Sequence, residues 1–293
     1  METVKHDPVT GQATTGHEWN GIEELDTPVP KVVVASLVVT TIFAIICWVL
    51  YPTFPLGRTY TKGLTGFDQR NEVTMQVAKA DAARAVAWTA QVETMAYADI
   101  EADPDLLLPA KEAGRTLFDD NCAACHGVNA TGGPGFPDLS AKAWLWGGEP
   151  ETIEETIRVG INSTHDDTRV SQMMAFGRDG ILDREQIGNV VVYVRSLSGA
   201  LPAEGSAERI EAGSQVFAEN CVACHGDDAK GNHDLGAPNL TDASWIYGGD
   251  AQSVYSSVYS GRQGHMPHWG DRLSPLQIKL LTLYVHTLEG DAK

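Results

Sequence analysis

The feature that most constrains the fold is a duplicated motif in which C-x-x-C is followed at once by histidine. "EAGRTLFDDNCAACHG" occupies residues 112–127 and "EAGSQVFAENCVACHG" occupies residues 211–226, with ten of sixteen positions identical. Further on, "PDL" and "WLWGG" in the first copy match "PNL" and "WIYGG" in the second, in the same order. Ordered matches of this kind indicate an internal repeat, so the second part of the chain consists of two copies of one module.

Each copy is predicted to be mainly helical, with glycine- and proline-rich loops between a first and a last helix. A first helix leads into each cysteine motif, over residues 111–121 and 210–220. The last helices are predicted to begin at Asp183 and Ser274, because a glutamine three residues later completes a capping box in both. Neither copy has enough continuous apolar sequence to form a core by itself, so a large apolar group is expected to fill each one.

The cysteine motif has several chemical interpretations. A C-x-x-C pair can be a redox dithiol, a disulfide or half of a zinc site. The adjacent histidine favours haem, because two thiols three residues apart can add to the vinyl groups of one haem while the histidine binds its iron. A zinc site would gather four ligands in one place, whereas these motifs lie in separate copies. The motifs therefore predict two covalently bound haem c groups, attached at Cys122 and Cys125 and at Cys221 and Cys224, with His126 and His225 as axial iron ligands.

Methionines are candidates for the second axial ligand of each iron. When the aromatic–glycine pairs at residues 176–177 and 269–270 are aligned, Met173 falls opposite Met266. Met174 then takes the position of Pro267. A single methionine is more often a core residue, but matched methionines ahead of the last helix favour ligation. The expected pairs are therefore Met173 with the first haem and Met266 with the second.

Three histidines near these methionines are alternative ligands, namely His165, His265 and His268. His265 and His268 have no histidine counterpart in the first copy, and His165 lies in "THDD", which is typical of a solvated loop. Ligation by histidine and methionine leaves iron without an open position and raises its reduction potential. The sites are therefore predicted to transfer single electrons, with no catalytic residues.

A single apolar run near the N-terminus predicts a membrane helix. Residues 32–51 carry no charge, and a helix of this length, at about 1.5 Å per residue, spans the roughly 30 Å of a bilayer core. Pro52 and Pro55 then stop the helix. The stretch before the run is long and acidic and the run ends in bulky residues, unlike a cleaved signal peptide. We therefore predict a retained transmembrane helix over residues 29–52.

Charge does not set the orientation of this helix, because lysines and arginines flank it on both sides. They are only slightly more numerous on the C-terminal side. The haem motifs decide it, because haem c is attached outside the cytoplasmic membrane in bacteria. The expected organisation is a cytoplasmic tail (1–28), the membrane helix, a periplasmic helical linker (53–107) and two cytochrome c domains in the periplasm (108–200 and 201–293). The fold class is mainly α: one transmembrane helix in the bacterial inner membrane, followed by two tandem cytochrome c-like helical domains.

The overall charge limits the classes of partner. The chain has 39 aspartates and glutamates against 21 lysines and arginines, a formal charge of −18. This balance argues against binding to nucleic acid and against adhesion to an anionic membrane surface. It suits a face that receives a basic protein partner, although solubility alone accounts for it equally well.

Three features together resemble the di-haem c subunit, CcoP or FixP, of cbb3-type cytochrome c oxidases. They are the acidic tail "HEWNGIEELDTPVP", the helix exit "YPTFP" and the two haem c modules, and the resemblance covers essentially the whole chain. It implies one haem on Cys122, Cys125, His126 and Met173, and another on Cys221, Cys224, His225 and Met266. The chain departs from the family pattern where Met173 is followed by Met174 instead of proline.

The resemblance implies an electron-transfer role without a catalytic centre. A subunit of this family accepts electrons from a periplasmic donor cytochrome c and passes them to a mono-haem c subunit. From there they reach the haem–copper catalytic subunit, where oxygen becomes water and protons are pumped. The expected partners are these subunits, the donor and membrane lipid. The rival hypotheses are a membrane-anchored di-haem carrier for another respiratory complex or dehydrogenase, a di-haem peroxidase and a haem-based gas sensor.

Overall fold

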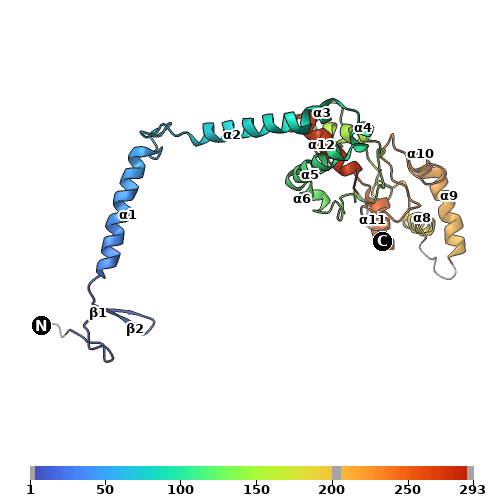
Figure 1. Ribbon diagram of the computed structural model, residues 1–293. Helices are drawn as coiled ribbons and strands as arrows, with labels where there is room; N and C mark the ends of the chain where they lie inside the picture. Colours follow the sequence, from blue (N-terminus) through green and yellow to red (C-terminus); the bar gives the residue numbers. More distant parts are fainter. Residues whose placement is uncertain (1–3, 200–205, 289–293) are drawn as a thin grey trace. The chain divides into compact units, whose positions relative to one another are not determined.

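The structure is a computed structural model that describes residues 4–199 and 206–288 of the chain. It divides into two compact units, one ending at Ala82 and the other beginning at Ala83 (Figure 1). The expected boundary between the two copies, at residues 200 and 201, lies outside the described residues, as do residues 289–293 at the end of the second copy.

The first unit opens with a β-hairpin that the sequence analysis did not predict. Strands β1 (Thr14–Trp19) and β2 (Ile22–Leu25) pair antiparallel. They are joined by Asn20 and Gly21, which have φ angles of 53° and 86°. Two successive positive φ angles at Asn-Gly match the favoured two-residue hairpin turn, so the dipeptide was the available signal.

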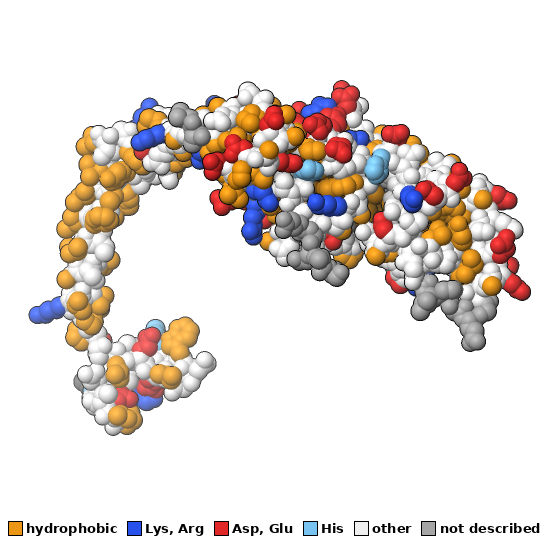
Figure 2. Space-filling model, turned by 45° about the vertical axis from the view of Figure 1, so that its right-hand side comes forward, with side chains coloured by type: hydrophobic (Ala, Val, Ile, Leu, Met, Phe, Trp, Pro, Cys, Tyr) orange, Lys and Arg blue, Asp and Glu red, His pale blue; other side chains and the backbone are white. Residues whose placement is uncertain are grey.

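Helix α1 (Lys31–Leu50) follows and is apolar throughout, with a mean hydropathy of 2.7 in its most apolar window and no buried residue. Hydrophobic side chains cover it in Figure 2. By length and composition it can cross a membrane, as predicted for residues 29–52. The chain then folds back, and the backbone amides of Leu64 and Thr65 donate to the carbonyls of Val49 and Leu50 at distances of 3.0 and 3.1 Å. These bonds cap the last turn of α1.

The remaining elements are helical. They are α2 (Gln69–Arg84), a π-helical turn η1 (Ala85–Thr89), α3 (Ala90–Thr94), α4 (Tyr97–Glu101), α5 (Pro104–Asn121), α6 (Ala123–His126), α7 (Pro150–Val159), α8 (Arg184–Leu197), α9 (Ala207–Asn220), α10 (Val222–His225), α11 (Ala251–Ser260) and α12 (Pro275–His286). The capping boxes predicted at Asp183 and Ser274 are both present. The middle helices α7 and α11 were not predicted, although Pro150 opens one and the Asp250 side chain caps the other.

The two copies exchange their last helices. Helix α5 of the first copy packs on α12 of the second, and α9 of the second copy packs on α8 of the first. In each contact the helices approach closely at a glycine that leaves no room for a side chain. A Cβ on Gly114 would lie 2.3 Å from the Leu280 carbonyl oxygen, and one on Gly213 would lie 2.2 Å from that of Asn189. The cytochrome c domains expected at residues 108–200 and 201–293 therefore do not each close around their own last helix.

The chain crosses between the copies at two equivalent points. Gly160 and Gly261 end α7 and α11 with φ of 70° in both. The next residue pairs with a predicted ligand of the other copy: Ile161 exchanges two backbone hydrogen bonds with Met266, both at 2.9 Å. Arg262 does the same with Met173, at 2.8 and 3.1 Å. Only nine residues lie between α8 and α9, and so short a connection favours the packing of these consecutive helices on each other.

The segment that was expected to end a linker at residue 107 belongs largely to the folded second unit. Val92 and Ile100 are fully buried and pack with Leu283 of α12. The Tyr97 hydroxyl donates to Glu154 at 2.6 Å, and His286 Nδ1 lies 2.6 Å from a carboxylate oxygen of Glu101. Residues 88–107 thus pack against α12 as part of the second unit.

Candidate functional site

Two compartments, one around each cysteine motif, follow from this exchange. The first compartment is formed by α5, α6, α7 and α12, and the second by α8, α9, α10 and α11. The core of the first comprises Phe118, Ala130, Ile153, Ile157, Trp269, Ile278, Leu281, Tyr284 and Val285. The core of the second comprises Phe176, Leu182, Ile187, Val190, Val191, Val194, Val216, Phe217, Ala229, Val254 and Val258. Each compartment therefore takes its apolar lining from both copies.

The histidine of each motif is fixed by a proline carbonyl. His126 Nδ1 lies 3.2 Å from the carbonyl oxygen of Pro137, and His225 Nδ1 lies 3.1 Å from that of Pro238. A carbonyl only accepts, so Nδ1 carries the proton and Nε2 is left with a free lone pair. This is the arrangement of histidines that bind metals. Burial lowers the pKa of both imidazoles, which favours the neutral, ligating form.

The thiols do not have the properties of a redox dithiol. Burial raises the pKa of Cys122 and of Cys221 to about 11, whereas reactive cysteines have a lowered pKa. Cys125 and Cys224 are exposed, and no cysteine in the described residues forms a disulfide. Each motif therefore presents one half-buried and one exposed thiol beside its histidine, which suits attachment to one edge of a partly enclosed group.

The structure reverses the predicted pairing of the methionines. Met266 packs against the core of the first compartment, with Cys122, and Met173 packs against that of the second, with Cys221. The alignment matched equivalent positions correctly. However, the crossings after Gly160 and Gly261 carry each methionine into the compartment of the other copy. Met174, the other candidate in the first copy, is 53% exposed.

The alternative histidines lie together near the first crossing. The rings of His165 and His268 are 5.6 Å apart, and His265 Nδ1 lies 2.9 Å from the Asn162 carbonyl oxygen. In the part of the chain that the structure describes, no three histidine, cysteine, aspartate or glutamate side chains are grouped so as to hold a metal ion.

Two buried donors without partners test whether the compartments suit haem. Trp146 Nε1 and Arg169 Nε are buried and have no hydrogen-bond partner among the described residues. The Arg169 guanidinium lies 5.0 Å from the centre of the Trp146 indole, which packs on Gly236 of the other copy. We call this contact between the copies the seam. Buried donors need an acceptor, and the carboxylate of a haem propionate would supply one, so the residues fit the group.

Sequence reasoning missed these residues and the proline carbonyls. Trp146 lies in "WLWGG" and corresponds to Tyr247 in "WIYGG", and the matched "PDL" and "PNL" contain the two prolines. The second copy repeats the arginine–aromatic stack, with Arg262 lying 4.2 Å from the centre of the Tyr247 ring. Repeated tryptophan and proline positions were thus a usable signal, whereas Arg169 has no local pattern that distinguishes it.

The fold and the paired motifs define a class of protein: a cytochrome of the c type with two haem-binding motifs, following a helix that can cross a membrane. Family models support each part. Residues 11–58 match the N-terminal domain of cytochrome oxidase-cbb3, FixP; residues 111–198 match cytochrome c; and residues 208–285 match cytochrome C oxidase, cbb3-type, subunit III. The mainly helical fold with tandem cytochrome c domains is confirmed.

Similar proteins match this chain over nearly its full length. The chain is 48% identical to the cbb3-type cytochrome c oxidase subunit FixP of Bradyrhizobium sp. strain ORS 278, over 97% of each chain. It is 45% identical to FixP of Azorhizobium caulinodans over 97% of each chain, and 43% identical to CcoP of Azospirillum brasilense over 99% of each. The chain belongs to the FixP/CcoP family of cbb3-type cytochrome c oxidase subunits.

Proposed function

We propose that this subunit accepts electrons from a donor cytochrome c in the periplasm and passes them to a mono-haem c subunit. From there they would reach the haem–copper catalytic subunit of a cbb3-type oxidase, where oxygen is reduced to water and protons are pumped. The observation that carries the proposal is the placement of a methionine of the other copy in the compartment of each C-x-x-C-H motif. Two protein ligands on each iron would leave no position for oxygen or peroxide.

The exchange of helices supports a specific set of ligands for each haem. The first haem would be held by Cys122, Cys125, His126 and Met266, and the second by Cys221, Cys224, His225 and Met173. When bound, each haem supplies one-electron chemistry at its iron. The cysteines would fix one edge of the haem, and the core side chains would exclude water from its compartment. The proline carbonyl orients the imidazole of the motif histidine. The two compartments meet at the seam within one folded unit, which holds the two sites at a fixed separation.

The topology follows from attachment chemistry. Helix α1 would be a single-pass anchor in the inner membrane, with residues 1–28 in the cytoplasm and the second unit in the periplasm. The segment 161–261, which forms most of the second compartment, has fourteen aspartates and glutamates against six lysines and arginines. Acidic side chains are prominent on this part of the surface in Figure 2. This charge supports docking of a basic donor on the second unit.

Mass and optical spectra of the purified full chain test the haem assignment. The mature chain should exceed its polypeptide mass by two haems, and the Cys122→Ser/Cys125→Ser variant should exceed it by one. A spectrum of low-spin iron with histidine and methionine ligands is expected, without carbon monoxide binding by the reduced protein. Carbon monoxide binding would indicate a peroxidase or sensor instead. Purification without a copper-containing oxidase would favour a carrier for another respiratory complex or dehydrogenase.

A further inference from the structure

The segment between α1 and α2 is a folded structure with its own cavity. Besides the backbone bonds that cap α1, the Thr61 hydroxyl accepts from the amides of Thr53 and Phe54, at 3.3 and 3.0 Å. Beside this fold lies a cavity of about 480 Å³. Its lining includes the rings of Tyr51, Tyr60 and Phe67, and those of Tyr51 and Phe67 meet edge to face at 6.1 Å. The cavity begins one residue after the apolar helix ends.

The charge of this segment is opposite to that of the chain. Residues 51–70 contain Arg58, Lys62 and Arg70 but only one acidic residue, Asp68, whereas the whole chain carries −18. Arg70 and Asp68 both line the cavity. Figure 2 shows lysine and arginine side chains gathered where α1 joins α2.

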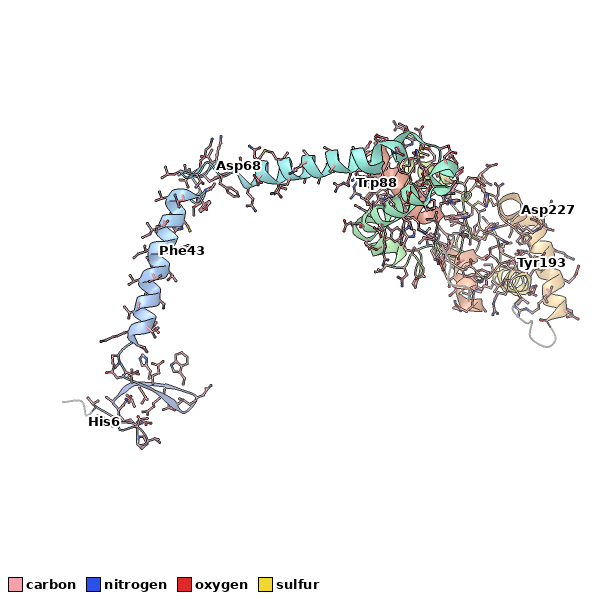
Figure 3. The ribbon with its side chains drawn as sticks, in the orientation of Figure 1. His6, Phe43, Asp68, Trp88, Tyr193 and Asp227 are labelled. Carbon is pink, nitrogen blue, oxygen red and sulfur yellow. The ribbon has the colours of Figure 1, made fainter. Side chains whose placement is uncertain are left out.

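None of these three cations is neutralised within the described residues. No ion pair to Arg58, Lys62 or Arg70 is present in the described part of the chain. The Asp68 carboxylate, labelled in Figure 3, accepts from the backbone amides of Arg70 and Asn71 at 3.0 and 3.2 Å. It is therefore engaged in capping the start of α2.

We propose that this cavity binds the phosphate headgroup of an anionic phospholipid, with Arg70 as its main cationic contact. The position directly after a membrane-spanning helix places the cavity at the depth of lipid headgroups. Aromatic rings belong at that depth, and unpaired cations there attract anionic lipid. The net charge of the chain argues against general adhesion to an anionic surface, so this local reversal of charge indicates a specific site. The proposal depends on the membrane helix and not on the haem groups, so it stands or falls separately from the proposed electron transfer.

Lipid retention by the full haem-containing chain tests the site. The protein in detergent is titrated with palmitoyl-oleoyl phosphatidylglycerol or phosphatidylcholine, and bound lipid is counted by native mass spectrometry. Preferential retention of phosphatidylglycerol is expected. Arg70→Gln should weaken that retention about fivefold, the effect of one juxtamembrane charge. Lys79→Gln removes the same charge from an exposed position further along α2 and should change retention less than about twofold.

Several outcomes would overturn the proposal. Equal retention of the two lipids would mean that the cavity does not select an anionic headgroup. Equal weakening by Arg70→Gln and Lys79→Gln would mean that only general charge attraction operates. A photoreactive phenylalanine analogue in place of Tyr60 reports the occupant in native membranes. A phospholipid adduct is expected, and an adduct with another protein subunit would show that protein covers the cavity. An unchanged haem spectrum and an unchanged circular dichroism spectrum show that the variants remain folded.

Discussion

Replacing Ile278 by alanine should loosen the haem site that carries Cys122, although Ile278 belongs to the second copy. Ile278 is 4% exposed in the core of the first compartment, on the helix that follows Met266. Truncating a buried isoleucine to alanine costs about 2–5 kcal/mol. At about 3 kcal/mol, the population with α12 displaced rises on the order of a hundredfold. Ile187 is the matched control, because it follows the capping box of α8 as Ile278 follows that of α12. It is also fully buried in the second compartment.

Cyanide binding to ferric haem measures this opening, since cyanide reaches the iron only when methionine has left. The chain with Cys221→Ser and Cys224→Ser should carry only the first haem. In that chain, Ile278→Ala should accelerate cyanide binding about a hundredfold and Ile187→Ala much less, because binding follows the open population. The chain with Cys122→Ser and Cys125→Ser should give the reverse pattern.

The opposite assignment would refute the exchange of helices. If Ile187→Ala accelerates cyanide binding at the first haem while Ile278→Ala leaves it unchanged, each copy closes its own site with its own last helix. Equal, small effects of both variants would show that α8 and α12 do not control the methionine ligands.

Three further predictions concern the seam, the segment before α5 and the acidic surface. Arg169→Gln should lower one haem midpoint potential by on the order of 40 mV in a redox titration. The reason is that losing a cation worth about 1 kcal/mol favours the oxidised site. An unchanged potential would place Arg169 away from the propionates. Tyr97→Phe should lower the free energy of unfolding by about 1–2 kcal/mol through loss of the bond to Glu154. Burial raises the pKa of Tyr97 in the folded chain, so its contribution is present below the unfolded pKa of about 10 and is lost as the pH rises above it. Thermal denaturation should therefore show a steeper alkaline loss in the wild type than in the variant. Oxidation of a basic donor should slow steeply with added salt, and a flat response would contradict docking on the acidic surface.

Local structure was largely readable from the sequence. The apolar run gave α1 to within two residues at each end, and the glutamines three residues after Asp183 and Ser274 gave the starts of α8 and α12. These signals act within one or two turns of helix, where a few side chains decide the outcome. The hairpin at Asn20 and Gly21 had an equally local signal that was not used.

The sequence did not predict which last helix packs on which first helix, because the two copies resemble each other. Gly114 and Gly213 occupy equivalent positions, so each would permit close approach of either last helix. Phe118 and Phe217 are likewise equivalent, and each lies in the core of its compartment. The choice between the two arrangements therefore depends on tertiary features such as the residues that hold α12. The buried donors at the seam were hidden for the same reason, since Trp146 meets Gly236 only after the copies have exchanged helices.

The crossing at Ile161 and Met266 also bears on the order of events during biogenesis. A haem attached at Cys122 as the chain emerges from the membrane would wait for its sulfur ligand until residue 266 had been exported. Until then its iron would remain open to stray ligands and to premature oxidation. Truncation anywhere before α12 would therefore damage the earlier site first, and quality control of the whole subunit could rest on its final helix.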